Sequence, residues 1–351
     1  MALTSSGALS LNEIHVEAGG DTGTTAGLND TDIRDLISKS SGATMAFNEW
    51  YGAASVIPTG LIAGGEGAAK TNTIQKITIS TTGNSTDFGD LSSARGNYGN
   101  GAGSSTRALY FGGQAAGGNV DTIEFSVFAT AGDVTDFGNL TVTSGFNTAL
   151  SSSTRAVSAL SEIPGTARSD VLEFVTMASA GNSTDFGNLL AGRTASSASF
   201  SSPTRGIFAG GWDLTAPNGY EVIEFITIAS AGNSTDFGDL SYAGLYQGGA
   251  SNSTRGLIAG GYNSGFTKQN IVEFITIASA GDATDFGDLS AVSAPGPACA
   301  TSSTRMVAAL GETVTMDYFT ISSAGNSTDF GDSLAAVGLS ASCSNVHGGL
   351  A

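Results

Sequence analysis

The sequence predicts an all-β fold, a six-bladed β-propeller of four-stranded blades, preceded by a small N-terminal module with a short helix. The first observation is a word that recurs six times, from GNSTDFGDL at 83–91 to GNSTDFGD at 325–332. The second is its spacing, because successive copies of its Phe are separated by 49, 49, 51, 49 and 44 residues. These positions are Phe88, Phe137, Phe186, Phe237, Phe286 and Phe330. Such a period is typical of supersecondary units that bury a core only by stacking.

Each period contains four strand-like segments in a constant order. A small-residue run ends in Ser-x-Thr-Arg or a close variant, as at 202–205, and an apolar stretch ending in two glycines follows, as at 206–211. The third segment, EVIEFITIAS at 221–230, is rich in β-branched and aromatic residues, which favour an extended conformation. The TDFG word closes the unit after a turn of Gly and Asn. Four strands in each of six periods predict the six four-stranded blades.

The two ends of the chain are expected to complete one blade together. A propeller has to cover its first and last strand edges. PTGLIAGG at 58–65 matches PTRGIFAGG at 203–211 without its Arg, and the repeat count places His347 near the slot of the next Arg. We therefore expect residues 341–346 to pair with 60–65. The alternative places GAASVI, 52–57, in that position and leaves the C-terminal tail outside.

The repeat unit resembles the Kelch repeat over about residues 52–351. GIFAGG, VIEFITIA and TDFGDL hold the places of its Gly-Gly strand, its hydrophobic strand and its aromatic strand, with Phe where Kelch repeats usually have Trp. A looser resemblance links STDFGDL at 85–91 with the Asp-box of sialidases, although the Thr-Trp of that motif is missing. The Kelch resemblance implies a propeller over 56–351.

Residues 1–55 differ in texture from the repeats. SLNEIHVEAGG, LNDTDIRDLIS and MAFNEWYGA resemble the opening module of tailed-phage virion proteins, notably from phages of marine bacteria, which often join it to a repeat domain. The resemblance implies docking to other virion proteins; the alternative is a cap resting on the propeller. Asn29 or Asp30 is suited to cap a short helix. The candidate docking residues are Ile33, Leu36, Phe47, Trp50 and Tyr51.

The composition of the chain excludes some classes of binding partner. The chain has 351 residues and a formal net charge of −18, which argues against nucleic acid because phosphate binding needs a basic face. The sequence contains no run of eighteen apolar residues, so we expect no membrane-spanning helix. The N-terminus lacks the basic and apolar regions of a secretory signal. The expected localisation is the virion, with assembly in the host cytoplasm. There, Cys299 and Cys343 are expected to be free, buried thiols.

No residues form a recognisable catalytic or metal site. His15 and His347 lack a triad context, and two Cys with two His at unrelated positions do not make a zinc site. We therefore expect no cofactor and no enzymatic activity. The TDFG aspartates are expected to cap their own turns by accepting backbone N–H bonds, rather than to bind Ca²⁺. They are Asp87, Asp136, Asp185, Asp236, Asp285 and Asp329.

The repeated arginines are expected to be structural. Five equivalent positions suggest a repeated pair with the acid of the long strand (Glu124, Glu173, Glu224 and Glu273) or with the TDFG Asp, at the seam between blades. The arginines are Arg107, Arg155, Arg205, Arg255 and Arg305.

The segments that differ between repeats are the candidates for function, because rigid scaffolds place recognition on variable loops. Trp212, Tyr220, Tyr262 and Phe266 stand in such loops and suit sugar faces or protein contacts. The favoured interpretation is a tail-associated adhesin (tail fibre or baseplate) that binds a host-surface glycan or protein. The alternatives are a capsid decoration or purely structural virion protein and a polysaccharide-degrading propeller. A symmetric virion position would make it a homo-oligomer.

Overall fold

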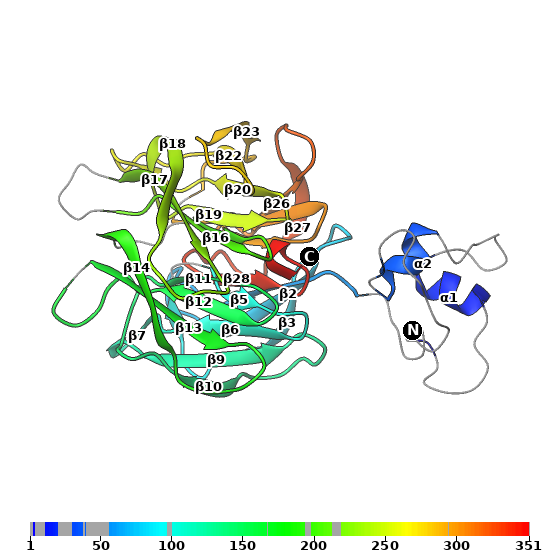
Figure 1. Cartoon of the computed structure of the whole chain (residues 1–351), viewed down its shortest axis with the longest axis horizontal. Coiled ribbons are helices and arrows are strands. Elements are labelled where there is room, and N and C mark those ends of the chain that lie inside the picture. Colours follow the sequence, from blue (N-terminus) through cyan, green and yellow to red (C-terminus); the bar gives the residue numbers. More distant parts are fainter. Residues whose placement is uncertain are drawn as a thin grey trace. The chain divides into compact units, whose positions relative to one another are not determined.

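The computed structural model describes residues 3, 11–19, 30–37, 39, 56–96, 100–166, 168–193, 198–212, 219–293 and 295–350. The chain divides into two compact units, residues 1–57 and 58–351. The described residues contain two short α-helices, both in the first unit, and many small antiparallel sheets in the second. The predicted all-β class is confirmed, and the arrangement is compatible with a β-propeller (Figure 1).

The first unit has a small apolar core of its own. Helix α1 spans Leu11–Glu17 and helix α2 spans Thr31–Asp35, with Asp30 in the N-cap position. Leu3, Ile14 and Ile33 form the buried cluster between them.

The second unit repeats one antiparallel sheet six times, with its four strands hydrogen-bonded in the order in which the repeat presents them. We number the sheets along the chain. The first contains β28 (Ala341–Ser344), β1 (Thr59–Ala63), β2 (Thr73–Thr78) and β3 (Thr86–Asp90). The second contains β5 (Ala102–Gly103), β6 (Arg107–Phe111), β9 (Thr122–Val127) and β10 (Thr135–Asn139). The third contains β11 (Thr148–Ser151), β12 (Arg155–Ala159), β13 (Ser169–Thr176) and β14 (Thr184–Arg193).

The remaining sheets follow the same order. The fourth contains β15 (Ala198–Ser201), β16 (Arg205–Ala209), β17 (Tyr220–Thr227) and β18 (Thr235–Leu245), with β21 (Tyr262–Asn263) added at its edge. The fifth contains β19 (Gly248–Ser251), β20 (Arg255–Ala259), β22 (Ile271–Thr276) and β23 (Thr284–Asp288). The sixth contains β24 (Ala298–Thr301), β25 (Arg305–Ala309), β26 (Thr315–Thr320) and β27 (Thr328–Asp332). A small extra sheet joins β4 (Arg95–Gly96), β7 (Gln114–Ala115) and β8 (Gly118–Asn119).

The first sheet joins the two ends of the second unit. Strand β28 pairs with β1 in the register Gly60↔Ser344 to Ala63↔Ala341, which is the predicted pairing of 341–346 with 60–65. We call β28, β5, β11, β15, β19 and β24 the lead strands. The lead strands labelled in Figure 1 (β28, β5, β11 and β19) lie toward the middle of the unit, whereas β10 and β23 lie at its periphery. Each lead strand contacts the next, and β28 in turn contacts β5.

The apolar core is divided among the seams between neighbouring sheets. Six buried clusters each combine residues of two adjacent sheets, and one of them joins Ile62 and Ile77 of the first sheet with Val307 and Phe330 of the sixth. The Phe of each TDFG word is buried in one of these seams. No sheet therefore has a complete core alone, as the repeat period predicts.

The TDFG word encodes a β-bulge. In the fourth sheet Glu224 lies opposite Asp236 and Ile223 lies opposite Gly238, so that Phe237 is the extra residue. The bulge turns the Phe ring into the seam, where it makes an edge contact with Phe225 at 6.1 Å. Equivalent register shifts recur in the other five sheets.

The Gly-Asn turn of each sheet binds the TDFG word of the sheet before it, an arrangement we call the turn clasp. Between the fourth and fifth sheets, Gly281 N–H donates to the Phe237 carbonyl at 2.7 Å, and Asp239 N–H donates to Asp282 Oδ1 at 3.1 Å. Gly238 has φ +150°, and a Cβ there would lie 2.5 Å from the Gly281 carbonyl. The same clasp joins the sixth sheet to the first, where Gly83 N–H donates to the Phe330 carbonyl at 2.7 Å. The repeated word thus supplies contacts between sheets.

Candidate functional site

The two ends of the repeated sheets carry different segments. Because the strands alternate in direction, the loops after second strands and those before lead strands share one end, which we call the loop end. The Ser-x-Thr-Arg turns and the turn clasps share the opposite end, which we call the turn end. The polypeptide enters the second unit at the turn end, where the Pro58 carbonyl accepts from Ile79 N–H at 2.8 Å. The C-terminal tail lies there too, since Asn345 N–H donates to the Thr59 carbonyl.

Five aromatic side chains form a continuous series at the loop end, which we call the aromatic array. It runs from Trp212 through Phe266, Tyr262 and Tyr246 to Phe146, with successive ring centroids 5.5, 6.3, 6.2 and 6.2 Å apart. These rings come from loops of different repeats, so the packing of the sheets brings them together. The Phe266 side chain is 50% exposed, and the other four residues are half-buried.

Three residues of the array have an uncommon backbone conformation. Phe146, Tyr246 and Phe266 have φ of 56°, 52° and 56°, and among the described residues Leu339 is the only other non-glycine residue with positive φ. Bulky side chains rarely adopt this conformation, which costs of order 1–3 kcal/mol and is retained mainly at functional sites. Phe146, Tyr246, Gly296 and Leu339 each stand two residues before a lead strand, so a glycine is tolerated at this repeat position.

Three of the four predicted recognition residues, Trp212, Tyr262 and Phe266, belong to the array. The sequence reading missed Phe146 and Tyr246. The signal was available in the alignment of the repeats, because both stand at the same place in the loop before a lead strand.

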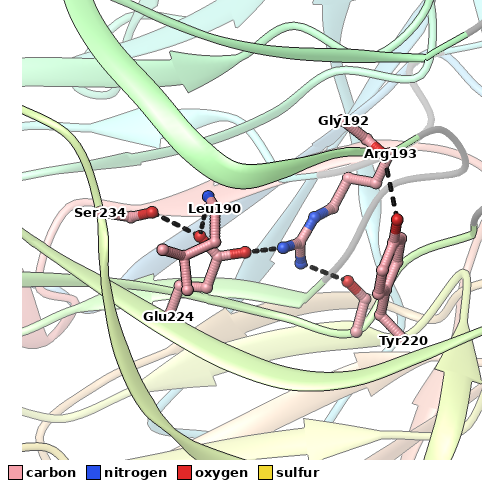
Figure 2. Close-up of polar contacts among 7 residues, drawn as sticks. Leu190, Gly192, Arg193, Tyr220, Glu224 and Ser234 are labelled. Atoms are coloured by element: carbon pink, nitrogen blue, oxygen red, sulfur yellow. Dashed lines mark hydrogen bonds and ion pairs between the residues drawn. The ribbon is translucent and has the colours of Figure 1, made fainter.

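The fourth predicted residue, Tyr220, contacts a buried ion pair instead (Figure 2). Its hydroxyl donates to the Gly192 carbonyl at 3.4 Å, and the Arg193 guanidinium lies 5.1 Å from its ring centroid. Arg193 pairs with Glu224 and donates to the Gly210 carbonyl at 2.6 Å. Burial lowers the pKa of Arg193 to about 10, so the guanidinium remains charged at neutral pH.

Glu224 is buried and links two sheets. It accepts from Leu190 N–H of the third sheet at 2.8 Å and from the Ser234 hydroxyl of its own sheet (Figure 2). Gln75 occupies the equivalent place in the first sheet and accepts from Leu334 N–H of the sixth sheet and from Ser85. A neutral amide therefore performs the same link where no arginine is present.

The charges beside the array are few. Burial, together with nearby Tyr262 and Glu162, raises the pKa of Tyr246 to about 12, so its hydroxyl stays protonated at neutral pH. Lys268 lies in the same loop as Phe266, and its Nζ pairs with the Glu312 carboxylate of the sixth sheet at 2.5 Å. Beyond Phe146 lies an open hollow of about 450 Å³, lined by Asn119, Thr143, Glu162 and Ile163–Thr166.

The expected pairing of the repeated arginines with acids is wrong. Each guanidinium instead donates to a backbone carbonyl of the next sheet and lies over an aromatic ring of its own sheet. Arg205 donates to the Ile277 carbonyl at 2.9 Å and lies 4.8 Å from the Phe225 ring centroid. The corresponding carbonyl partners of Arg107, Arg155, Arg255 and Arg305 belong to Met177 and Ala178, Ile228, Ile321 and Ile79. Glu173, Glu224 and Glu273 accept from backbone N–H groups or hydroxyls, and Glu124 pairs with the buried Arg95, so these acids are not available to the repeated arginines.

The expected role of the TDFG aspartates is wrong as well. All six are exposed, and within the described residues none of their side chains accepts a hydrogen bond. The turn is instead held by the Asn or Asp that follows its Gly, as Asn182 Oδ1 accepts from Asn139 N–H at 3.0 Å. The bulge at the Phe points the preceding Asp to solvent. The aspartates are Asp87, Asp136, Asp185, Asp236, Asp285 and Asp329.

The lead strands surround a small cavity of about 40 Å³, lined by both hydroxyl-bearing and apolar side chains. Hydroxyls at the ends of these strands each donate to the carbonyl of the preceding strand, from Ser151 to Gly103 at 2.7 Å through to Ser344 to Thr301 at 2.6 Å. The volume suits a few buried waters and no larger ligand. Cys299 and Cys343 line this cavity as buried free thiols, as expected, and burial raises the pKa of both.

His347 closes the turn end of this cavity. Its Nε2–H donates to the Gly103 carbonyl at 2.8 Å, and its Nδ1 accepts from Gly349 N–H at 3.1 Å. Ser151 Oγ lies 3.2 Å from Nε2, but that nitrogen carries the proton and cannot act as a base toward Ser151. The contact is therefore structural.

The candidate docking residues fall into two groups. Ile33 is fully buried in the core of its own unit, and Leu36 packs against that core, so Ile33 offers no surface to a partner. The other three, Phe47, Trp50 and Tyr51, lie outside the described residues.

The described residues contain no group of three or more His, Cys, Asp or Glu side chains placed to hold a metal ion. In the same part of the chain no helix has the length and apolarity needed to cross a membrane. Comparison of the chain with known protein families and with curated protein sequences finds no match.

Proposed function

We propose that the six sheets are the blades of a six-bladed, Kelch-like β-propeller closed by the C-terminal strand. The support is the recurrence of each intersheet contact between the sixth and first sheets. The turn clasp joins Phe330 to Gly83, Arg305 donates to the Ile79 carbonyl, and Leu334 N–H donates to Gln75. A six-membered cycle of equivalent contacts leaves no sheet without a neighbour on either side.

We further propose that the protein is a non-enzymatic, tail-associated bacteriophage virion protein that recognises a host surface. The resemblance of residues 1–55 to a phage virion module supports attachment through that segment. The observation that carries recognition is the aromatic array, in which three residues accept an unfavourable backbone conformation at the loop end. The second unit begins at its turn end, at Pro58, and the array lies at the loop end of the same unit.

The test is to locate the chain in an intact particle by cryo-electron microscopy. We expect it at the tail tip or baseplate, with the loop end directed outward. Density on the capsid would instead support the decoration role, and a loop end buried against another virion protein would overturn host recognition.

A further inference from the structure

We propose that the aromatic array and the adjacent hollow together bind a neutral oligosaccharide. This inference rests on the proposed recognition function and names its ligand class. The site would run from Trp212 along the array to Phe146 and continue into the hollow lined by Asn119, Thr143 and Glu162.

The array offers the kind of surface that sugar rings use. A pyranose ring has an apolar face of C–H groups that packs on aromatic rings while its hydroxyls remain in water. Successive ring centroids are 5.5–6.3 Å apart and successive ring planes are inclined at 51–87°, so the array is an angular apolar surface on which individual exposed rings, above all Phe266, can contact a sugar face. The Tyr246 and Tyr262 hydroxyls add polar tips to an otherwise apolar surface.

The hollow offers hydrogen-bonding groups at the end of this surface. Thr143 and Glu162 line it, and the backbone bridge between Gly145 and Glu162 ties it to the loop that carries Phe146. Its volume lies within the range of small-ligand sites, and hydroxyls of a sugar could donate to the Glu162 carboxylate.

The charges favour a neutral ligand over an acidic one. Glu162 lies close enough to Tyr246 to act on its hydroxyl, so an anionic sugar on the array would meet a carboxylate. Lys268, the cation beside Phe266, is paired with Glu312 and is not offered to a ligand. The net charge of −18 opposes acidic polysaccharides further.

The strained backbone adds to the argument at two positions. Phe146 and Tyr246 keep a positive φ at a repeat position where Gly296 shows that glycine is accepted, while Leu339 shows that a non-aromatic residue is held there as well. The array differs from Leu339 in that its positive-φ residues bring aromatic rings into contact with one another.

The experiment incubates the full-length protein with a printed array of neutral and acidic microbial oligosaccharides, and the best ligand is then titrated by calorimetry. We expect at least one neutral class to bind, with at least a tenfold preference over acidic chains. Phe266→Gly and Tyr262→Ala should each weaken binding at least tenfold. Leu339→Gly is the matched control, because Leu339 has the same φ of 56° outside the array, and it should leave binding unchanged.

A third variant tests the electrostatic step. Glu162→Gln should increase the affinity for acidic chains several-fold, because it removes the opposing carboxylate while keeping a polar side chain. Absence of any neutral ligand, or binding that survives Phe266→Gly, would overturn the inference. If neutral sugars fail but the purified particle still loses host adsorption with Phe266→Gly, the ligand class is wrong while the proposed recognition function stands.

Discussion

The turn end and the loop end of the repeated sheets differ in which residues adopt positive φ. Among the described residues those at the turn end are all glycines, and at some of them backbone of the next sheet lies where a Cβ would be, as at Gly238. At the loop end Phe146, Tyr246 and Phe266 adopt positive φ although each carries a large side chain. The first arrangement allows two backbones to approach closely, and the second positions a side chain.

This difference separates assembly from recognition. The six turn clasps have equivalent hydrogen bonds throughout, so selection on the turn end concerns the fit between sheets. The loops at the other end differ in sequence and length, and three of the four described non-glycine residues with positive φ there are aromatic. Stability and binding should therefore respond to mutation at different ends of the same sheets.

The largest expected effect lies between the two ends, at the buried ion pair. Glu224→Gln removes the charge opposite Arg193, whose guanidinium is 97% buried by side-chain area, and should destabilise the fold by about 3–5 kcal/mol. Chemical denaturation followed by circular dichroism measures the loss. The control is Glu273→Gln, since Glu273 accepts only from Ser241 N–H and has no arginine partner. Equal losses in both variants would show that the pair itself contributes nothing.

A smaller effect tests the turn end directly. Gly238→Ala places a Cβ 2.5 Å from the Gly281 carbonyl at a φ that only glycine adopts readily, which should cost about 2–4 kcal/mol. Gly232→Ala is the control, because a Cβ there meets nothing within 4 Å. We expect the control to unfold within about 1 kcal/mol of the wild type. A loss of less than about 1 kcal/mol in Gly238→Ala would show that the turn clasp can accommodate the added Cβ.

The repeated arginines should have an intermediate effect. Arg205→Ala loses the hydrogen bond to the Ile277 carbonyl and the contact with the Phe225 ring, together about 1–2 kcal/mol. Arg205→Thr is an informative companion, since Thr59 stands at the equivalent register position of the first sheet. Thermal unfolding should show a lowered Tm for both variants. An unchanged Tm would contradict a structural role for these arginines.

The repeated strands could be predicted from the sequence, but the hydrogen-bond partners of the repeated side chains could not. The period of the TDFG word predicted the sheets, and the match of 58–65 to 203–211 predicted the pairing of β28 with β1. The partners of Arg205 and Asp236 were mispredicted, because opposite charges suggest pairs whereas the bulge at Phe237 decides which groups face the seam. Backbone carbonyls, which no side-chain pattern reveals, took the place of the expected acids.

The aromatic array shows the same limit at the loop end. Trp212, Tyr262 and Phe266 were visible as aromatics in variable loops. Their meeting with Phe146 and Tyr246 depends on how loops of different repeats converge, which a single sequence does not encode locally.

The C-terminal tail should make the turn end sensitive to acid. Burial lowers the pKa of His347, and its Nδ1 must stay unprotonated to accept from Gly349 N–H. The other groups that face the imidazole, the Gly103 carbonyl and the Ser151 hydroxyl, do not titrate in this range. Because the folded-state pKa is depressed, the contribution of His347 is complete above about pH 6.5 and is lost as pH falls toward the lowered value.

His347→Gln keeps a side-chain N–H for the Gly103 carbonyl and removes the titration. The free energy of unfolding should therefore fall less between pH 7.5 and pH 5 in this variant than in the wild type. The two proteins differ only at residue 347, so the difference between their pH responses isolates His347. Identical responses would mean that the tail does not depend on a neutral imidazole.

The smallest effect on stability should come from the array itself. Phe266 is half exposed, so Phe266→Gly loses little buried area and removes the strain of a φ of 56°. We expect a change in the free energy of unfolding within about 1 kcal/mol, of either sign, by chemical denaturation. Leu339→Gly, with the same φ, should behave alike in this measurement. If Phe266→Gly instead destabilised the protein as much as Gly238→Ala, the ring would be part of the core, and the contrast between an end that assembles and an end that recognises would fail.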